Sequence, residues 1–359
     1  MESVISIKTT ELTIRQPDDW HVHLREGSML KAVLPYTARQ FARAIIMPNL
    51  AEPVTTVAKA VDYRRRILQA LSEVDGVKGF LPLMTAYLTD KTETSDLNDG
   101  YKDDIFAAAK LYPANATTNS ASGVTDISKL EPVFRNMEET GMPLLIHGEV
   151  NDPTVDVFDR EEVFIRRVLK PLIMTFPNLR VVLEHITTSE AVDFIRSMEG
   201  KVAATITPHH LIINRNALFE KGLRPHYYCL PVAKRERHRL ALRNAATSGE
   251  PWFFLGTDTA PHPISAKEAS CGCAGIFSAL TALELYTQVF EEEEALDKLE
   301  SFASLNGPAF YGLNTNDRSI TILREDWVIP DRVTISGQEE IRPFLAGEKL
   351  RWKVQAKQD

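Results

Sequence analysis

Short apolar runs recur along the chain, separated by longer segments with helical periodicity. The runs are rich in Val, Ile, Leu and Phe, and eight can be counted, at residues 20–24, 44–48, 79–87, 105–111, 143–147, 181–186, 202–207 and 252–256. Continuous apolar runs of this length are typical of strands that are buried on both faces of a parallel sheet. Parallel strands need crossover connections, so the alternation with helical segments predicts an α/β fold.

The segments between the runs supply the crossover helices. Helical patterns cover residues 57–71, 127–140, 161–175, 189–197, 234–247 and 279–290. Eight strand and helix units over roughly 290 residues match a (β/α)8 TIM barrel, for which ~250 residues is typical. A doubly wound open sheet is the alternative, but no Gly-x-Gly-x-x-Gly or Walker-type loop follows an early strand. We therefore predict a TIM barrel.

The C-terminal residues predict a short extension of this barrel. Three strand-like pieces, SITIL, DWVIP and LRWKV, follow Gly312. No internal repeat, low-complexity segment or Pro-rich linker divides the chain, so we expect a single domain over residues 1–359. Within it, the barrel is expected over about residues 14–312, and the extension over about 313–359 is expected to pack on the barrel.

Composition narrows the range of partners. The formal net charge of −8, from 41 basic and 49 acidic residues, gives no reason to expect nucleic acid or an anionic membrane as a partner. A small molecule is the expected ligand. No stretch approaches the ~20 apolar residues that cross a bilayer, and no basic segment followed by an apolar run opens the chain, so we expect a cytoplasmic protein. The three cysteines, Cys229, Cys271 and Cys273, are too few for a disulfide framework and are expected to have packing roles.

Histidines lie in or at the end of several predicted strands. Residues i and i+2 of a strand point to the same face, so His21 and His23 can hold one metal ion together. His147 and His185 each close a later run at its C-terminal end, where a TIM barrel places its active site. Because neutral imidazole is the commonest metal ligand, this pattern predicts a metal site on the barrel rim.

Asp258 and Lys110 end two further runs. A single strand-end histidine is more often a hydrogen-bonded rim residue than a ligand, and Asp258 taken alone could be a cap. Histidines at three strand ends with an aspartate at a fourth favour a metal site. A protonated lysine cannot bind a metal, and its ordinary role is to reach toward water. If Lys110 instead adds carbon dioxide, the resulting carbamate can bridge two ions, and the spacing alone does not decide between these alternatives.

The order of these residues resembles the binuclear zinc site of the amidohydrolase superfamily. Longer strings, among them DDWHVHLR, KLYPANATTNS, LGTDTAPH and SCGCAG, are similar to the dihydroorotases of the shorter, dimeric bacterial type over nearly the full chain. The resemblance implies a homodimer with two Zn²⁺ per subunit, bridged by N6-carboxylated Lys110 and a hydroxide. His21, His23 and Asp258 would complete the shell of one ion, and His147 and His185 that of the other.

The reaction implied by this resemblance is the reversible cyclisation of N-carbamoyl-L-aspartate to L-dihydroorotate and water, a step of de novo pyrimidine biosynthesis. The bridging hydroxide would attack the ring amide, with Asp258 as general base and then general acid. Arg25, two residues after His23, offers a guanidinium that matches a carboxylate. The resemblance assigns further substrate contacts to His23, Asn49, Thr117, Thr118, His147, Leu230, His262 and Ala274, with Leu230 and Ala274 acting through main-chain groups and the threonines on a flexible loop.

Two other functions stay open at this point. A cyclic amidase of the hydantoinase or dihydropyrimidinase kind would keep the zinc site without needing Arg25, Asn49 and His262 together. A noncatalytic scaffold on the same fold would be marked by loss of a ligand, and every ligand position is filled. The remaining histidines have no role in this scheme: His209 and His210 are expected at the rim, with His226 and His238 facing solvent.

Overall fold

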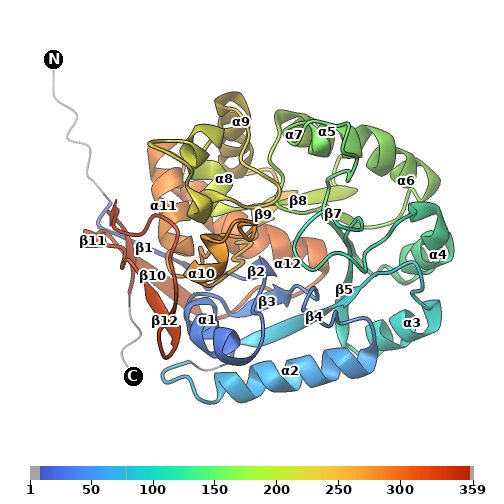
Figure 1. Cartoon of the computed structure of the whole chain (residues 1–359), viewed down its shortest axis with the longest axis horizontal. Coiled ribbons are helices and arrows are strands. Elements are labelled where there is room, and N and C mark those ends of the chain that lie inside the picture. Colours follow the sequence, from blue (N-terminus) through green and yellow to red (C-terminus); the bar gives the residue numbers. More distant parts are fainter. Residues whose placement is uncertain (1–8, 78, 356–359) are drawn as a thin grey trace.

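A closed barrel of parallel strands forms the centre of the computed structural model, which describes residues 9–77 and 79–355. Its eight strands follow one another in sequence order around the sheet (Figure 1). They are β2 (Asp19–Val22), β3 (Arg43–Ile46), β4 (Leu81–Tyr87), β5 (Phe106–Leu111), β6 (Leu144–Ile146), β7 (Val181–Leu183), β8 (Val202–Ile206) and β9 (Phe253–Leu255). Each lies within one of the eight apolar runs or overlaps it, so the predicted TIM barrel is confirmed.

The first and last strands meet at the end of the barrel where the candidate ligands lie. The amide of Asp258 donates to the carbonyl of His21 at 2.9 Å, and the amide of His23 donates to the carbonyl of Thr259 at 3.0 Å. The buried carboxylate of Asp19 adds a second link, because Oδ1 accepts from the amides of His21 at 3.1 Å and Thr257 at 2.9 Å. These bonds join the strand of His21 and His23 to the strand that precedes Asp258.

Helices surround the sheet and cover its outer face (Figure 1). The helices that follow the early strands are α1 (Gly27–Gln40), α2 (Val57–Leu71), α3 (Thr94–Lys102), α4 (Glu131–Thr140), α5 (Arg160–Phe164) and α6 (Lys170–Thr175). Those that follow the later strands are α7 (Ser189–Ser197), α8 (Pro208–Ile212), α9 (Glu236–Thr247), α10 (Ile264–Lys267), α11 (Ala282–Glu292) and α12 (Asn306–Tyr311). All six predicted helices are present. A turn of π-helix at residues 165–169 joins α5 to α6 within the predicted segment 161–175.

The alternation of side chains along the strands produces two apolar layers. Leu145 points into the barrel, where it packs with residues such as Trp20 and Phe254. Its neighbours Leu144 and Ile146 belong instead to the layer between sheet and helices. Helix α2 contributes to that outer layer through Ala60, Tyr63, Ile67 and Ala70, whose spacing places them on one face of a helix.

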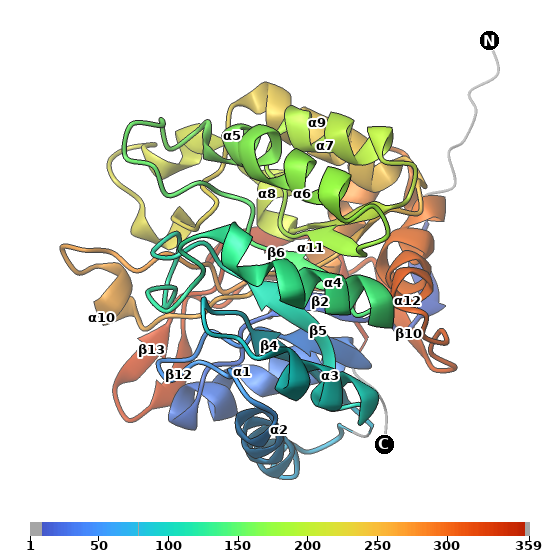
Figure 2. The ribbon, with the colours of Figure 1, turned by 90° about the vertical axis from the view of Figure 1, so that its right-hand side faces the viewer.

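Short antiparallel strands form the C-terminal extension on the outside of the barrel (Figure 2). The piece SITIL forms β10 (Ser319–Leu323), which lies between β1 (Glu11–Arg15) and β15 (Lys353–Val354). Two further pairs join β11 (Trp327–Val328) to β14 (Lys349–Leu350), and β12 (Val333–Ser336) to β13 (Glu339–Ile341). The extension docks on α11, where Trp352 is fully buried and its Nε1 donates to Glu291 at 3.1 Å.

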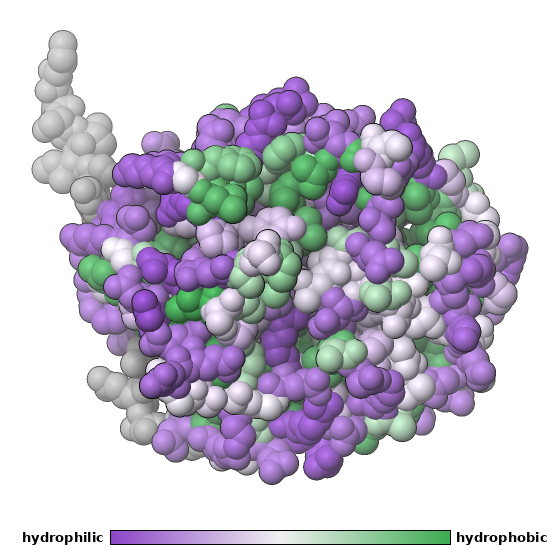
Figure 3. All heavy atoms as spheres, viewed as in Figure 1, coloured by the Kyte–Doolittle hydropathy of each residue, from purple (hydrophilic) through white to green (hydrophobic). Residues whose placement is uncertain are grey.

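The face of the molecule in Figure 3 is mainly hydrophilic, with smaller hydrophobic patches between the polar groups. Large apolar side chains that are strongly exposed include Met174 and Leu223. None of the helices in the described part of the chain is both long and apolar enough to cross a membrane. The expected packing role is correct for the buried Cys229 but wrong for Cys271, which is exposed in the loop after α10.

Candidate metal centre

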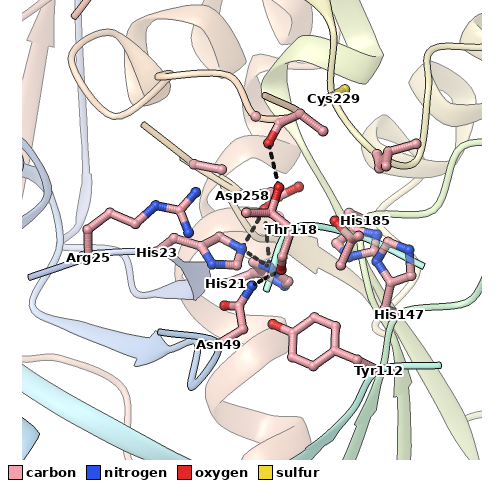
Figure 4. A pocket seen from close by; sticks show the side chains of 15 residues that line it. His21, His23, Arg25, Asn49, Tyr112, Thr118, His147, His185, Cys229 and Asp258 are labelled. Carbon is pink, nitrogen blue, oxygen red and sulfur yellow. Dashed lines mark hydrogen bonds and ion pairs between the residues drawn. The ribbon is translucent and has the colours of Figure 1, made fainter. Parts of the chain in front are cut away.

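Four histidines form a row at the C-terminal end of the barrel, in the order His23, His21, His185 and His147 (Figure 4). The centroids of successive rings lie 5.2, 4.9 and 4.9 Å apart. All four side chains are buried. The structure therefore brings together residues from the ends of three strands, although more than a hundred positions in the sequence separate His23 from His147.

Three of the predicted ligand atoms converge at one end of this row. Nε2 of His21 lies 3.2 Å from Nε2 of His23, and Oδ1 of Asp258 lies 3.2 Å and 3.1 Å from these two nitrogens. Ligands bound at ~2.0–2.1 Å in a tetrahedral shell are separated by about 3.3 Å, so the three atoms fit one zinc-sized ion. The i, i+2 prediction for His21 and His23 is thus consistent with their geometry.

Carboxylates hold the opposite nitrogens of two of the rings. Nδ1 of His21 lies 2.9 Å from Oε1 of Glu184. Nε2 of His147 lies 3.1 Å from Oε2 of Glu149. Metal-binding imidazoles characteristically use the second ring nitrogen in this way, which fixes the tautomer and the ring orientation. The contacts leave Nε2 of His21 and Nδ1 of His147 as the nitrogens available to metals.

Burial sets the charge states of the cluster. It lowers the pKa of His21, His147 and His185, and that of His23 to about 3, so the imidazoles are neutral near pH 7 and have free lone pairs. Burial by itself would raise the pKa of Asp258, but the neighbouring His21 and His23 hold it well below its usual range. Neutral imidazoles with an ionised carboxylate are the donor set that a divalent cation binds.

Lys110 ends β5 and is completely buried. Its Nζ contacts Oε2 of Glu184 and lies 4.8 Å from the centroid of the Tyr112 ring. Burial lowers the pKa of Lys110 well below its usual range. The alternative in which its ammonium reaches bulk water is excluded by this burial, and the neutral amine is the form that adds carbon dioxide.

The backbone turns sharply where two of these strands end. His185 and Asp258 have φ values of +41° and +43°, and Arg25 has +59°. Side chains other than glycine rarely occupy this left-handed region, and strained residues of this kind concentrate at functional sites. Residue type and position in the sequence already indicate a functional role for these three residues, and their backbone conformation is an independent sign of a constrained site.

A pocket opens beside the row of histidines. It is lined by His21, His23, Arg25, Asn49, Tyr112, Thr117, Thr118, His147, His185, Cys229, Leu230, Asp258, Ala260, Ala274 and Gly275. Every predicted site residue except Lys110 and His262 is in this lining. His262 is nevertheless adjacent, because its Nε2 lies 3.1 Å from Nη2 of Arg25 and 3.0 Å from the carbonyl oxygen of Ala274.

The loop that contains Thr117 and Thr118 lies across the pocket (Figure 4). Nδ2 of Asn49 donates to the carbonyl of Thr118 at 3.0 Å, and Oγ1 of Thr118 donates to the carbonyl of Ala274 at 3.2 Å. Asn119 bonds back to the carbonyl of Asn49 at 3.0 Å. These contacts place the loop directly over the predicted carboxylate contacts.

Comparison with known proteins identifies the family. The model of the amidohydrolase family matches residues 18–317. The chain belongs to the amidohydrolase family. Within that family it is similar to a dihydroorotase of Erythrobacter litoralis, with 62% identity over 346 residues that cover 96% of this chain and 99% of the relative. The family and this relative show that the chain is a metal-dependent hydrolase acting on cyclic amides, of the dihydroorotase kind.

Solved structures agree with this placement. The crystal structure of a Saccharomyces cerevisiae dihydroorotase in complex with 5-fluoroorotic acid is 34% identical, with a TM-score of 0.88, and the match covers 97% of this amidohydrolase and 99% of the yeast chain. An L-hydantoinase of Arthrobacter aurescens has a TM-score of 0.79 at 15% identity, covering 96% and 83% of the two chains. The second likeness shows a shared fold alone.

The remaining histidines of this amidohydrolase depart in part from expectation. His209 and His210 lie on α8, just after β8, and both are buried. His238 was expected to face solvent, which is wrong: it is buried against α7, and its Nδ1 accepts from the amide of Ser189 at 3.0 Å. His226 is partly exposed, 2.9 Å from Glu268.

Several residues of the pocket were not predicted from the sequence. Tyr112 and Cys229 line it, and Glu149 and Glu184 hold ligand histidines. A signal did exist for the two glutamates, because each lies within two positions of a strand-end histidine, in His-Gly-Glu and Leu-Glu-His. Tyr112 comes directly after β5 and two positions after Lys110. In an extended chain this spacing places both side chains on the same face.

Proposed function

We propose that the enzyme catalyses the reversible cyclisation of N-carbamoyl-L-aspartate to L-dihydroorotate and water, within pyrimidine biosynthesis. The observation that supports this most directly is the position of Arg25, Asn49 and His262 around the same pocket as the ligand histidines. A guanidinium with neighbouring amide and imidazole groups suits the carboxylate that both substrates contain. The yeast relative, crystallised with 5-fluoroorotic acid, is consistent with a pyrimidine carboxylate in this pocket.

The proposed cofactors are two Zn²⁺ ions. His21, His23 and Asp258 would hold one, His147 and His185 the other, and Lys110, carboxylated on Nζ, would lie between them. When bound, such ions lower the pKa of water from 15.7 toward ~7 and polarise a carbonyl oxygen. The fit of three ligand atoms to one ion and the burial of Lys110 beside them support this assignment.

Asp258 is the proposed proton carrier. Its carboxylate is ionised, is buried beside His21 and His23, and faces the pocket. In the hydrolytic direction it would accept the proton that water loses as it attacks the ring amide carbon, and it would then deliver that proton to the leaving ring nitrogen. Reversal of these two transfers closes the ring during synthesis.

The remaining residues are proposed to orient the substrate. Arg25, Asn49 and His262 would bind its carboxylate, and main-chain groups of Leu230 and Ala274 would bind the ring amide. The loop with Thr117 and Thr118 would close over the ring, adding hydroxyl donors and excluding water.

An assay on three rings tests the proposed reaction. Hydrolysis of L-dihydroorotate is measured by absorbance beside hydantoin and dihydrouracil. We expect turnover of dihydroorotate and little or none of the other two rings, because neither competitor has the carboxylate that Arg25, Asn49 and His262 are proposed to bind. Activity on a competitor without activity on dihydroorotate would refute the proposal and favour a hydantoinase-like amidase.

Metal analysis with intact mass tests the cofactors. Two metals and one added carbon dioxide per chain are expected. Lys110→Ala should lose at least part of the metal and regain activity when a short carboxylic acid is supplied, since only the bridging anion is missing. Two firmly held metals in that variant would argue against a bridging lysine.

The assembly and location of the enzyme are also proposals. We propose a homodimer that works in the cytoplasm, with the barrel and its extension in a single domain, of which residues 1–8, 78 and 356–359 lie outside the described part. Sedimentation at several concentrations would show the dimer as a species of twice the 40.3 kDa chain mass.

A further inference from the structure

Lys267, at the end of α10, is a buried lysine without a place in the mechanism above. Its side chain is 3% exposed. Nζ donates to three main-chain carbonyls, those of Tyr228 at 2.8 Å, Cys273 at 2.7 Å and Gly275 at 2.7 Å. An ammonium group has three donors, so all of them are used by backbone oxygens. A buried cation is costly unless it is bonded in this way.

The three carbonyls belong to the two segments that form one wall of the pocket. The first segment, residues 228–230, ends at Leu230, and the second, residues 273–275, is centred on Ala274. Both Leu230 and Ala274 line the pocket. The two segments also touch directly, because the amide of Gly275 donates to the carbonyl of Tyr228 at 3.0 Å. Lys267 therefore lies behind the wall and bonds to both of its halves.

The peptide of Ala274 is held on both sides. Lys267 bonds to the carbonyls of Cys273 and Gly275, the residues before and after it. The carbonyl of Ala274 itself is left to face the pocket, where it accepts from Thr118 at 3.2 Å and from Nε2 of His262 at 3.0 Å. The flanking bonds leave this carbonyl little freedom to turn.

We infer that Lys267 is a positioning residue for substrate binding, which sets the main-chain groups of Leu230 and Ala274 to receive the ring amide. The inference rests on the proposed function, since it concerns the same pocket. Lys267 is not itself among the residues that line the pocket or form the histidine row, and it acts through its bonds to the two backbone segments behind them. Its loss should weaken binding of the substrate ring, while the row of histidines and the proton carrier Asp258 stay in place.

Lys267→Met tests this inference, because methionine fills similar space without a donor. For L-dihydroorotate we expect KM to rise about tenfold or more, the effect of losing about 1.4 kcal/mol of binding, with kcat changed by less than about threefold. Loss of main-chain contacts that bind ground state and transition state alike raises KM without lowering kcat. Metal content should equal that of the wild type.

Arg243→Met provides the matched control. Arg243 is also a nearly buried cation, 8% exposed, but it pairs with Glu292 and Glu293 at the C-terminal end of α11, and it does not line the pocket. Its loss should lower the melting temperature and leave KM unchanged. If Lys267→Met behaved in the same way, with a lower melting temperature and wild-type KM, the lysine would be merely structural and the inference would be overturned.

Lys267→Gln keeps the test decisive if the methionine variant does not fold. Glutamine retains an N–H donor on a shorter side chain, so we expect its KM to lie between those of the wild type and the methionine variant. If only the glutamine variant folds, its KM is expected to be above that of the wild type. A folded Lys267→Gln variant with wild-type KM would overturn the inference. Failure of the proposed function is recognised separately, as absence of dihydroorotate turnover in the wild-type enzyme.

Discussion

Individual side chains of the pocket differ in whether the protein itself supplies partners for their polar atoms. His147 and His21 each have a carboxylate beside one ring nitrogen, from Glu149 and Glu184. The hydroxyl of Tyr112, by contrast, is buried and has no partner among the described residues. Buried polar groups are normally hydrogen-bonded. The carboxylate partners of His147 and His21 therefore fix the orientation of these two rings, whereas the unbonded hydroxyl of Tyr112 is free to bond to a ligand in the pocket.

Replacement of Asp258 separates proton transfer from architecture. Asp258→Asn preserves the shape of the side chain but cannot accept a proton, so kcat for dihydroorotate hydrolysis should fall by ~10²–10⁴ with the fold intact. Steady-state kinetics and metal analysis would measure both effects. Asp193→Asn, at an exposed position of α7, is the control and should keep wild-type turnover. Near-normal kcat in Asp258→Asn would contradict its role.

Removal of the Tyr112 hydroxyl should have opposite effects on activity and stability. The hydroxyl points into the pocket toward the side of Asn49 (Figure 4), and burial holds its pKa well above the usual range, so it remains a donor. In Tyr112→Phe we expect kcat/KM to fall about tenfold, because one hydrogen bond to the substrate is lost, while the melting temperature is unchanged or higher.

Tyr101→Phe is the comparison for this variant. Tyr101 donates to the carbonyl of Gly141 at 3.4 Å, outside the pocket lining, so its loss should leave kcat/KM unchanged. A Tyr112→Phe enzyme with wild-type kcat/KM would show that the hydroxyl does not meet the substrate.

At the scale of elements, the strands could be predicted and several of their connections could not. A continuous apolar run that ends in His147 or His185 contains both the strand and its functional end. The apolar pattern and the residue type were therefore sufficient to predict these strands and the site residues at their ends. Helix α1 was not among the predicted helices, and it contains Pro35. Strand β1 pairs with β10 more than 300 residues away, a partner that local pattern cannot identify. Residues such as Lys267 were missed for the same reason, because its role depends on segments brought together by folding.

The loop after α10 offers a sharp test of how closely these segments fit. Gly275 has φ +150°, and a Cβ there would lie 2.3 Å from the carbonyl oxygen of Ala260. Gly275→Ala should therefore displace the pocket wall, lower stability by roughly 1–3 kcal/mol and raise KM for dihydroorotate about tenfold. Urea unfolding and steady-state kinetics would measure the two effects.

Gly337→Ala separates backbone strain from this clash. Gly337, between β12 and β13, also has a positive φ, +58°, but a Cβ there would meet nothing within 4 Å. That variant should lose a little stability and keep wild-type KM. The prediction for Gly275 fails if the two variants have the same KM.

At the scale of the whole molecule, both ends of the described chain pack beside the barrel through one sheet. Strand β10 pairs with β1 on one side and β15 on the other. Helix α11 receives this sheet, because Glu284 accepts from the amide of Val354 at 3.1 Å and Glu291 accepts from Trp352. The barrel therefore depends on the extension to cover α11. The same packing buries the carboxyl group of Glu284, on α11, in an apolar layer.

That carboxyl group predicts how stability changes with pH. Glu284 is 5% exposed, its Oε2 has no partner in the described structure, and burial raises its pKa from 4.5 to about 7. A raised folded-state pKa means that the native protein binds the proton more tightly than the unfolded chain. The stabilisation is therefore fully present below about pH 4.5 and is lost as the pH rises through about 7.

We expect the free energy of unfolding to fall between pH 5 and pH 8 by up to about 3 kcal/mol on account of Glu284, since each pKa unit corresponds to about 1.4 kcal/mol. Glu284→Gln is neutral throughout, so it should remove this slope and be more stable than the wild type at pH 8. Urea unfolding at both pH values measures the effect, with Glu294→Gln, at an exposed position just beyond α11, as control. An equal pH slope in wild type and Glu284→Gln would show that the carboxyl group is not the source, and the docking of β15 on α11 would then be insensitive to its charge.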